Sequence, residues 1–225
     1  LRLQYEGLLA PYTPRHAALF PDEFKDQDGY WTGFAARARV LLVNTDRVKV
    51  GAFPRSVHDL ALPRWRGQTA IAKPLFGTTA THAAVLWGAW GAEKTRAYFT
   101  SLRENKVQIQ GGNKQVALAV SSGACAFGLT DTDDARIELE SGRPVAIVYP
   151  DSQADQMGTV FIPNTAAVLK NAPHPAAAHA LLDYLVSPVV EEALAQGPAA
   201  QLPLNSQTRS MNPPVHRGKT PAEVR

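Results

Sequence analysis

The chain has 225 residues, of which 45% are hydrophobic and 19% are charged. This length and composition support a buried core in one large domain or two small lobes, and they exclude a disordered chain. The formal net charge is +3 and the basic residues are scattered, so we expect no nucleic-acid partner.

Neither a membrane span nor a disulfide framework is expected. No apolar run approaches the roughly 20 residues that a membrane-spanning helix requires, and the first residues lack the pattern of a signal peptide. The one cysteine, Cys125, lies in an apolar stretch that is typical of a buried thiol. The first residues predict a helix that ends at Gly7, so we expect a further segment to precede them.

The first part of the chain predicts short strands and helices in alternation. After a proline-rich loop over 8–21, the apolar run Val40–Val43 is typical of a buried strand. Residues 54–66 predict a short capped helix and a turn, and residues 69–72 predict a second strand.

The middle of the chain predicts three helices. Thr78 or Thr79 can cap a helix that runs to about Trp90, and residues 92–105 predict a second helix with apolar and charged faces. A glycine-rich turn at 111–113 precedes the third.

The last part returns to the same alternation. Residues 124–129 predict a buried strand, followed by a polar cluster and a helix over 135–140. Residues 145–149 and 159–169 predict extended segments, and a pair of helices with proline starts follows over 175–186 and 188–196.

This alternation predicts an α/β fold with largely parallel sheets. In such folds, ligands gather at the carboxyl ends of strands and at the amino ends of helices. Two segments meet this rule, Gly77–Thr79 and Thr130–Asp134.

Six separated segments form an ordered series: Gly33–Thr45, Ser56–Gly67, Gly111–Val116, Gly158–Pro175, Tyr184–Pro188 and Leu202–Asn205. In this order they resemble segments of the ferric-iron-binding family of periplasmic solute-binding proteins. The family counterparts are a strand that crosses between lobes, a short helix with a P-x-W-x-G turn, a ligand loop, a return strand, a helix end and a tail. The resemblance covers about residues 5–206.

The resemblance implies a two-lobed, type II periplasmic-binding-protein fold in which the N-terminal part of the first lobe is missing. It implies a protein that closes on a small ligand by a hinge motion and presents it to the permease of an ABC importer, without catalysis. It also implies a periplasmic or other extracytoplasmic location and no cofactor, with ferric iron as one alternative ligand. An incomplete lobe would expose apolar surface that permits dimerisation.

The expected boundaries follow from the same resemblance. Residues 1–44 form the remainder of lobe 1 and the first hinge strand, and residues 45–157 form lobe 2. Residues 158–186 return to lobe 1, and residues 187–225 form a C-terminal helix and tail on lobe 2.

Three side chains are candidates for binding an anionic group. Thr78 and Thr79 begin a helix, where free N–H groups and two hydroxyls can bind an anion or act only as caps. Asn113 can donate its amide to a ligand oxygen or only stabilise a turn. The resemblance favours ligand binding at all three positions.

Two acidic residues are further candidates, first Asp131 at the strand end and then Asp133. The resemblance implies adjacent tyrosines at this place in iron-binding members, but this chain has Asp133 and Asp134 there. Carboxylates can bind a hard cation, an ammonium group or sugar hydroxyls, or they can cap the following helix.

Arg37 and Arg39 are expected on one face of an extended segment, because strand side chains alternate. Such a pair favours phosphate, phosphonate or carboxylate, and the alternative is a structural salt bridge across the hinge. Three ligands stay open: ferric iron, a phosphonate or organophosphate that carries an amine, and a polyol or sugar phosphate. An amine would pair with Asp131 or Asp133, so we expect Asp131→Ala to abolish binding without unfolding the protein.

Two functions of other classes are alternatives to transport. Asp131 and Asp133 after a strand are similar to the acidic pair of phosphoryl-transfer hydrolases, but no glycine-rich phosphate loop accompanies them. A ligand-sensing effector domain is the second alternative, because related two-lobed folds serve as effector modules. The six histidines show no zinc-binding spacing and are expected on the surface.

Overall fold

The structure is a computed structural model that describes residues 2–198 and 201–211. Its helices are α1 (Arg2–Tyr5), α2 (Gly77–Glu104), α3 (Asn113–Ser121), α4 (Thr132–Glu140), α5 (Pro175–Leu185), α6 (Pro188–Gln196) and α7 (Ser206–Met211). Its strands are β1 (Leu9–Ala10), β2 (Thr32–Asn44), β3 (Thr69–Ala72), β4 (Gln108–Gln110), β5 (Phe127–Asp131), β6 (Val145–Val148), β7 (Phe161–Ala166) and β8 (Val168–Leu169). Among these residues, no helix combines the length and the apolar character needed to cross a membrane.

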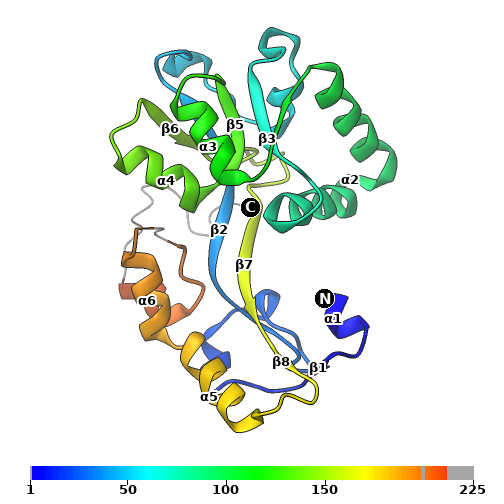
Figure 1. Cartoon of the computed structure of the whole chain (residues 1–225), viewed down its shortest axis with the longest axis vertical. Coiled ribbons are helices and arrows are strands. Elements are labelled where there is room, and N and C mark those ends of the chain that lie inside the picture. The colour runs from blue at the N-terminus through cyan, green and yellow to red at the C-terminus, as the bar shows by residue number, and fades with distance from the viewer. Residues whose placement is uncertain (1, 199–200, 212–225) are drawn as a thin grey trace. The chain divides into compact units, whose positions relative to one another are not determined.

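The described chain divides into two compact units. The first comprises residues 2–37 and the described part of 163–211, and the second comprises residues 38–162. The chain passes from one unit to the other twice, once within β2 and once within β7 (Figure 1).

The first unit contains the antiparallel pair β1 and β8 together with helices α5 to α7. The buried carboxylate of Glu191 in α6 accepts hydrogen bonds from the backbone N–H groups of Ala35 at 2.6 Å and Asn205 at 2.7 Å. These bonds attach α6 to the unit that holds β1 and β8. The expectation that residues 187–225 lie on the second lobe is therefore wrong for the described part of that range, and the remainder lies outside the described residues.

The second unit is built on a mixed sheet. In the described part of the chain its strand order is β4-β3-β5-β2-β6, with β7 also paired to β2. Strand β3 runs parallel to β4 and β5, whereas β2 runs antiparallel to both β5 and β6. The prediction of a largely parallel sheet is wrong at β2, because this strand enters from the other unit and lies between two strands that α4 connects.

Helices cover both faces of this sheet. Phe127 and Leu129 point into a hydrophobic cluster that includes Leu60, and Leu86 and Leu102 of α2. Helices α3 and α4 contact each other and contact β5 (Figure 1). Because side chains alternate along a strand, the opposite face of β5 at residue 128 meets α3.

Gly128 is required for this close approach of helix to sheet. A Cβ atom at this position would lie 2.6 Å from the Val116 side chain and 2.8 Å from the backbone oxygen of Ala70. We expect Gly128→Ala to reduce the free energy of unfolding by about 1–3 kcal/mol, measured by urea denaturation. Gly88→Ala is the matched control, because a Cβ there meets open space and alanine favours a helix. Equal stability of the Gly128 variant and the wild type would contradict this account.

The predicted elements agree with the structure where local signals are strong. The two helices expected on either side of Gly91 are present as one α2 interrupted there by a non-helical φ of 79° and ψ of 170°. The strand expected at Val40–Val43 is the end of the longer β2. The strand expected at 124–129 instead spans Phe127–Asp131. Two residues of the expected polar cluster, Thr130 and Asp131, therefore belong to the sheet, and α4 begins at Thr132 rather than at residue 135.

Candidate ligand-binding site

An ion pair between neighbouring strands forms the centre of the candidate site. Arg39 of β2 lies opposite Asp131 of β5 in the antiparallel register. The Arg39 Nη1 donates to Asp131 Oδ1 at 2.6 Å, and the two residues are only 0% and 3% exposed. Because both charges are removed from water, the attraction between them offsets part of the cost of burying each one.

Two further side chains bind the other oxygen of this carboxylate. The hydroxyl of Thr78 donates to Asp131 Oδ2 at 2.6 Å, and Nδ2 of Asn113 donates to the same oxygen at 2.8 Å. Asn113 Nδ2 also lies 2.7 Å from the Thr78 hydroxyl oxygen. These bonds connect the starts of α2 and α3 to the end of β5.

The guanidinium of Arg39 makes a second set of bonds. Its Nη1 donates to Asn113 Oδ1 at 3.0 Å, its Nη2 donates to Thr79 Oγ1 at 3.2 Å, and its Nε donates to His82 Nδ1 at 3.4 Å. All three guanidinium nitrogens therefore have partners within the protein. We call the six residues that share these bonds the Arg39 network: Arg39, Thr78, Thr79, His82, Asn113 and Asp131.

The Arg39 network lies at the amino ends of three helices. Phe76, Gly112 and Asp131 are the N-cap residues of α2, α3 and α4, and none makes a side-chain cap hydrogen bond among the described residues. The first N–H groups of a helix have no intrahelical acceptor, and the helix dipole makes this end positive. Three such ends beside one network add partial positive charge from backbone N–H groups.

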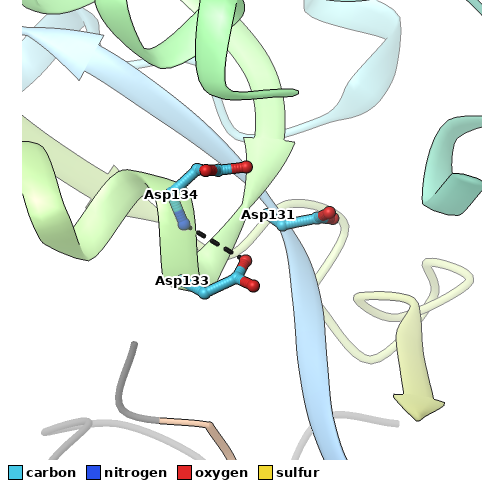
Figure 2. Close-up of side chains that lie close together, drawn as sticks. All are labelled: Asp131, Asp133 and Asp134. Atoms are coloured by element: carbon cyan, nitrogen blue, oxygen red, sulfur yellow. Dashed lines mark hydrogen bonds between the residues drawn. The ribbon is translucent and has the colours of Figure 1, made fainter. Parts of the chain in front are cut away.

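The acidic residues at the start of α4 form a cluster next to the network. One carboxylate oxygen from each of Asp131, Asp133 and Asp134 lies within 4.8 Å of the others. The three side chains extend in the same general direction, and the backbone N–H of Asp134 donates to Asp133 Oδ1 at 3.1 Å (Figure 2). Oxygen atoms at this spacing suit a hard cation or an ammonium group.

The structure brings together five of the seven residues predicted from the sequence: Arg39, Thr78, Thr79, Asn113 and Asp131. Asp133 lies beside them in the acidic cluster. Arg37 does not join them, because its Nη2 donates to Asn164 Oδ1 at 2.6 Å within the other unit. Arg39 and Asp131 bind each other, which differs from the expectation that they hold opposite ends of one ligand.

His82 is the network residue that sequence reasoning missed. We expected the histidines on the surface, but His82 is 3% exposed. Burial, together with the nearby Arg39 charge, lowers its pKa to about 3. Its position was detectable in principle, because His82 follows Thr78 by four residues on one helix and therefore lies on the same face.

Two features of this fold define the type II periplasmic-binding-protein class. A long antiparallel strand lies within a mixed sheet, and the chain passes twice between its two units. The arrangement resembles solved structures of that class, including iron-bound HitA from Pseudomonas aeruginosa, with a TM-score of 0.84 and 27% identity over 99% of this chain and 70% of that chain. The chain belongs to the bacterial extracellular solute-binding protein family, whose sequence model matches residues 1–222.

Two other relatives extend these similarities. Iron uptake protein A2 of Synechocystis sp. is 30% identical over 210 residues, which is 87% of this chain and 59% of that protein. The periplasmic binding protein AfuA of Actinobacillus pleuropneumoniae, solved with exogenous fructose-6-phosphate bound, has a TM-score of 0.82 and 23% identity over 99% of this chain and 70% of that chain. The chain thus spans less than two thirds of the curated relative's length.

Proposed function

We propose that the protein is the solute-binding component of an ABC importer. It acts outside the cytoplasm, captures a small solute without chemical change, and delivers it to a membrane permease. Membership of a solute-binding family and the similarity to iron uptake protein A2 and HitA support this role. The observation that carries the proposal is the Arg39 network at three uncapped helix starts, which is suited to binding an anionic group.

The chemistry of the network favours an oxyanion bound through backbone N–H groups, because the hydroxyls of Thr78 and Thr79 already donate to Asp131 and Asn113. The Arg39 charge is neutralised by Asp131, so the guanidinium is not a free partner for an anion. The helix amino ends still offer N–H donors and partial positive charge. A phosphate or phosphonate group fits this donor set, because its oxygens accept several hydrogen bonds at once.

The acidic cluster favours a ligand that also carries an ammonium group or several hydroxyls. Asp133 and Asp134 add negative charge beside the helix starts, which would repel a ligand that is purely anionic. The ligand class that we propose is therefore an amine-bearing phosphonate or organophosphate, or a sugar phosphate. The fructose-6-phosphate in the AfuA structure is consistent with the second of these.

Ferric iron is a second candidate, because three carboxylates lie close together and several relatives are named for iron. Iron would require the carboxylates to replace the tyrosines that the resemblance implies. A hydrolase is disfavoured, because both oxygens of Asp131 accept hydrogen bonds from protein groups and neither is positioned as a nucleophile.

Calorimetric titration tests the ligand class. The protein is titrated with fructose 6-phosphate, 2-aminoethylphosphonate, inorganic phosphate and ferric citrate, with fructose as the uncharged control. We expect one of the phosphorus compounds to bind and fructose not to bind. Tight binding of iron from ferric citrate, without binding of any phosphorus compound, would refute the oxyanion assignment.

Substitution of Thr78 tests whether the helix start is the binding surface. We expect Thr78→Val to weaken binding of the phosphorus compound by about tenfold, because the Thr78 hydroxyl joins the start of α2 to Asp131 and Asn113 and this link is lost. Thr81→Val on the same helix is the matched control, since Thr81 is exposed and bonds only to Gly77 O in the described part of the chain. Equal dissociation constants for both variants and the wild type would exclude this surface.

A further inference from the structure

The His82 side chain makes one hydrogen bond in the described part of the chain, which its Nδ1 accepts from Arg39 Nε. The Nε group of arginine can only donate, so Nδ1 of His82 must carry the acceptor lone pair. The proton of the neutral ring therefore resides on Nε2, and the low pKa of about 3 keeps the ring neutral.

The Nε2 of His82 is buried and has no hydrogen-bond partner among residues 2–198 and 201–211. The ring borders a small cavity of about 10 Å³ whose other walls include Leu86, Tyr98 and Leu129. An apolar side chain would fill this position without an unpaired donor. Packing alone therefore does not explain a histidine at this position, and its favourable contribution comes from the Nδ1 acceptor that binds Arg39.

The bond from Arg39 Nε to His82 fixes the plane of the guanidinium group. With Nε held, Nη1 is directed at Asp131 and Asn113, and Nη2 is directed at Thr79. These partners stand at the starts of three different helices. Arg39 can connect the three helix starts in one geometry only while its plane is held.

We propose that His82 is a positioning residue for ligand recognition. It orients Arg39, and Arg39 in turn holds the starts of α2, α3 and α4 at the spacing that receives the oxyanion. This proposal rests on the proposed function for its ligand, but the orientation of Arg39 can be measured without any ligand.

Two substitutions separate positioning from packing. His82→Leu fills the apolar surroundings but removes the acceptor. His82→Asn places an amide oxygen close to the position of Nδ1 and restores the acceptor with poorer filling of the space. We therefore expect the Leu variant to keep most of its thermal stability but bind less well, and the Asn variant to lose stability but bind well. His58→Asn is the matched control, because His58 is exposed and stacks on Trp90.

The first measurement is the NMR signal of the Arg39 Nε–H group in the protein without ligand, assigned by its disappearance in Arg39→Lys. We expect slow hydrogen exchange in the wild type and in His82→Asn, and fast exchange in His82→Leu. An unchanged Arg39 signal in His82→Leu would overturn the proposal.

The second measurement is the dissociation constant for inorganic phosphate and fructose 6-phosphate. We expect His82→Leu to weaken the binding of whichever compound the wild type binds by about tenfold, and His82→Asn to stay within about threefold of the wild type. Loss of the protected Nε–H signal without any change in affinity would overturn the role in recognition. If the wild type binds neither of these compounds and does not bind 2-aminoethylphosphonate, the oxyanion assignment fails, and the Arg39 signal still decides whether His82 positions Arg39.

Discussion

Asp131→Ala is expected to reduce the free energy of unfolding by about 3–5 kcal/mol, the largest effect of any single substitution considered for this protein. The variant leaves the Arg39 guanidinium at 0% exposure without its carboxylate partner. The remaining partners of Arg39 are neutral, so they do not replace the attraction that offset the lost hydration of its buried charge. Urea denaturation at neutral pH, followed by tryptophan fluorescence, measures the effect.

A double substitution distinguishes the lost pair from the lost side chain. Replacing Arg39 by Met and Asp131 by Leu removes both charges together, so we expect this variant to recover most of the stability that Asp131→Ala loses. Arg2→Ala is the control, because its ion pair with Glu6 is exposed and contributes little. A double variant as unstable as Asp131→Ala would contradict the electrostatic explanation.

This expectation replaces the simpler one drawn from the sequence, that Asp131→Ala abolishes binding without unfolding the protein. The structure gives Asp131 three protein donors, from Arg39, Thr78 and Asn113. A loss of binding in Asp131→Ala would therefore combine lost ligand contact with a damaged network. Thr78→Val is a cleaner probe, because Thr78 is only half-buried and carries no charge.

The free energy of unfolding is expected to decrease as the pH is lowered, because His82 is buried in its neutral form. The pKa of His82 is about 3 in the folded protein and about 6.5 in the unfolded chain. Between these two pH values, the His82 ring binds a proton in the unfolded chain but not in the folded protein. The stabilisation is fully present above pH 6.5 and decreases by about 1.4 kcal/mol per pH unit as the pH falls toward 3. Burial among apolar side chains is the main cause of this low pKa, and the nearby Arg39 charge lowers it further.

Denaturation of the wild type and His82→Asn at pH 7.5, 6, 5 and 4 isolates this contribution. Carboxylates such as Asp26 and Asp183 also have lowered pKa values, through backbone hydrogen bonds and neighbouring side chains, but both proteins share them. The stability difference between wild type and variant should therefore shrink by more than 2 kcal/mol from pH 6 to pH 4, at about 1.4 kcal/mol per unit. Parallel stability curves for the two proteins would show that His82 does not titrate in this way.

Most of the network was predictable because its residues carry local signals. Thr78, Thr79 and Asn113 start helices, and Asp131 ends a strand, so each belongs to an edge where ligands gather in α/β folds. The sequence did not reveal that Asp131 pairs with Arg39, because the pairing depends on the antiparallel register of β2 and β5. Residues 92 positions apart become neighbours only when the sheet order is known.

The different partners of Arg37 and Arg39 also depend on the tertiary structure. Alternation along a strand places both on one face, but the chain passes from one unit to the other between Arg37 and Ala38. Arg37 therefore meets Asn164, while Arg39 meets the helix starts of the second unit. The alternation of side chains predicts which face of a strand a residue lies on, but it does not predict which other elements pack against that face.

The sequence by itself determined the alternating α/β pattern, the breaks between the main helices, the polar helix starts and the family resemblance. These features depend on residues close together in the chain, whose conformational preferences act locally. The cap expected at Thr78 or Thr79 was wrong, because α2 begins at Gly77 with Phe76 as its N-cap. Only the tertiary structure decided the antiparallel place of β2, the attachment of α6 to the first unit, the burial of His82 and the neutralisation of Arg39 by Asp131. Each of these depends on contacts between residues distant in sequence, and burial sets the energy of such contacts by removing charged and polar groups from water.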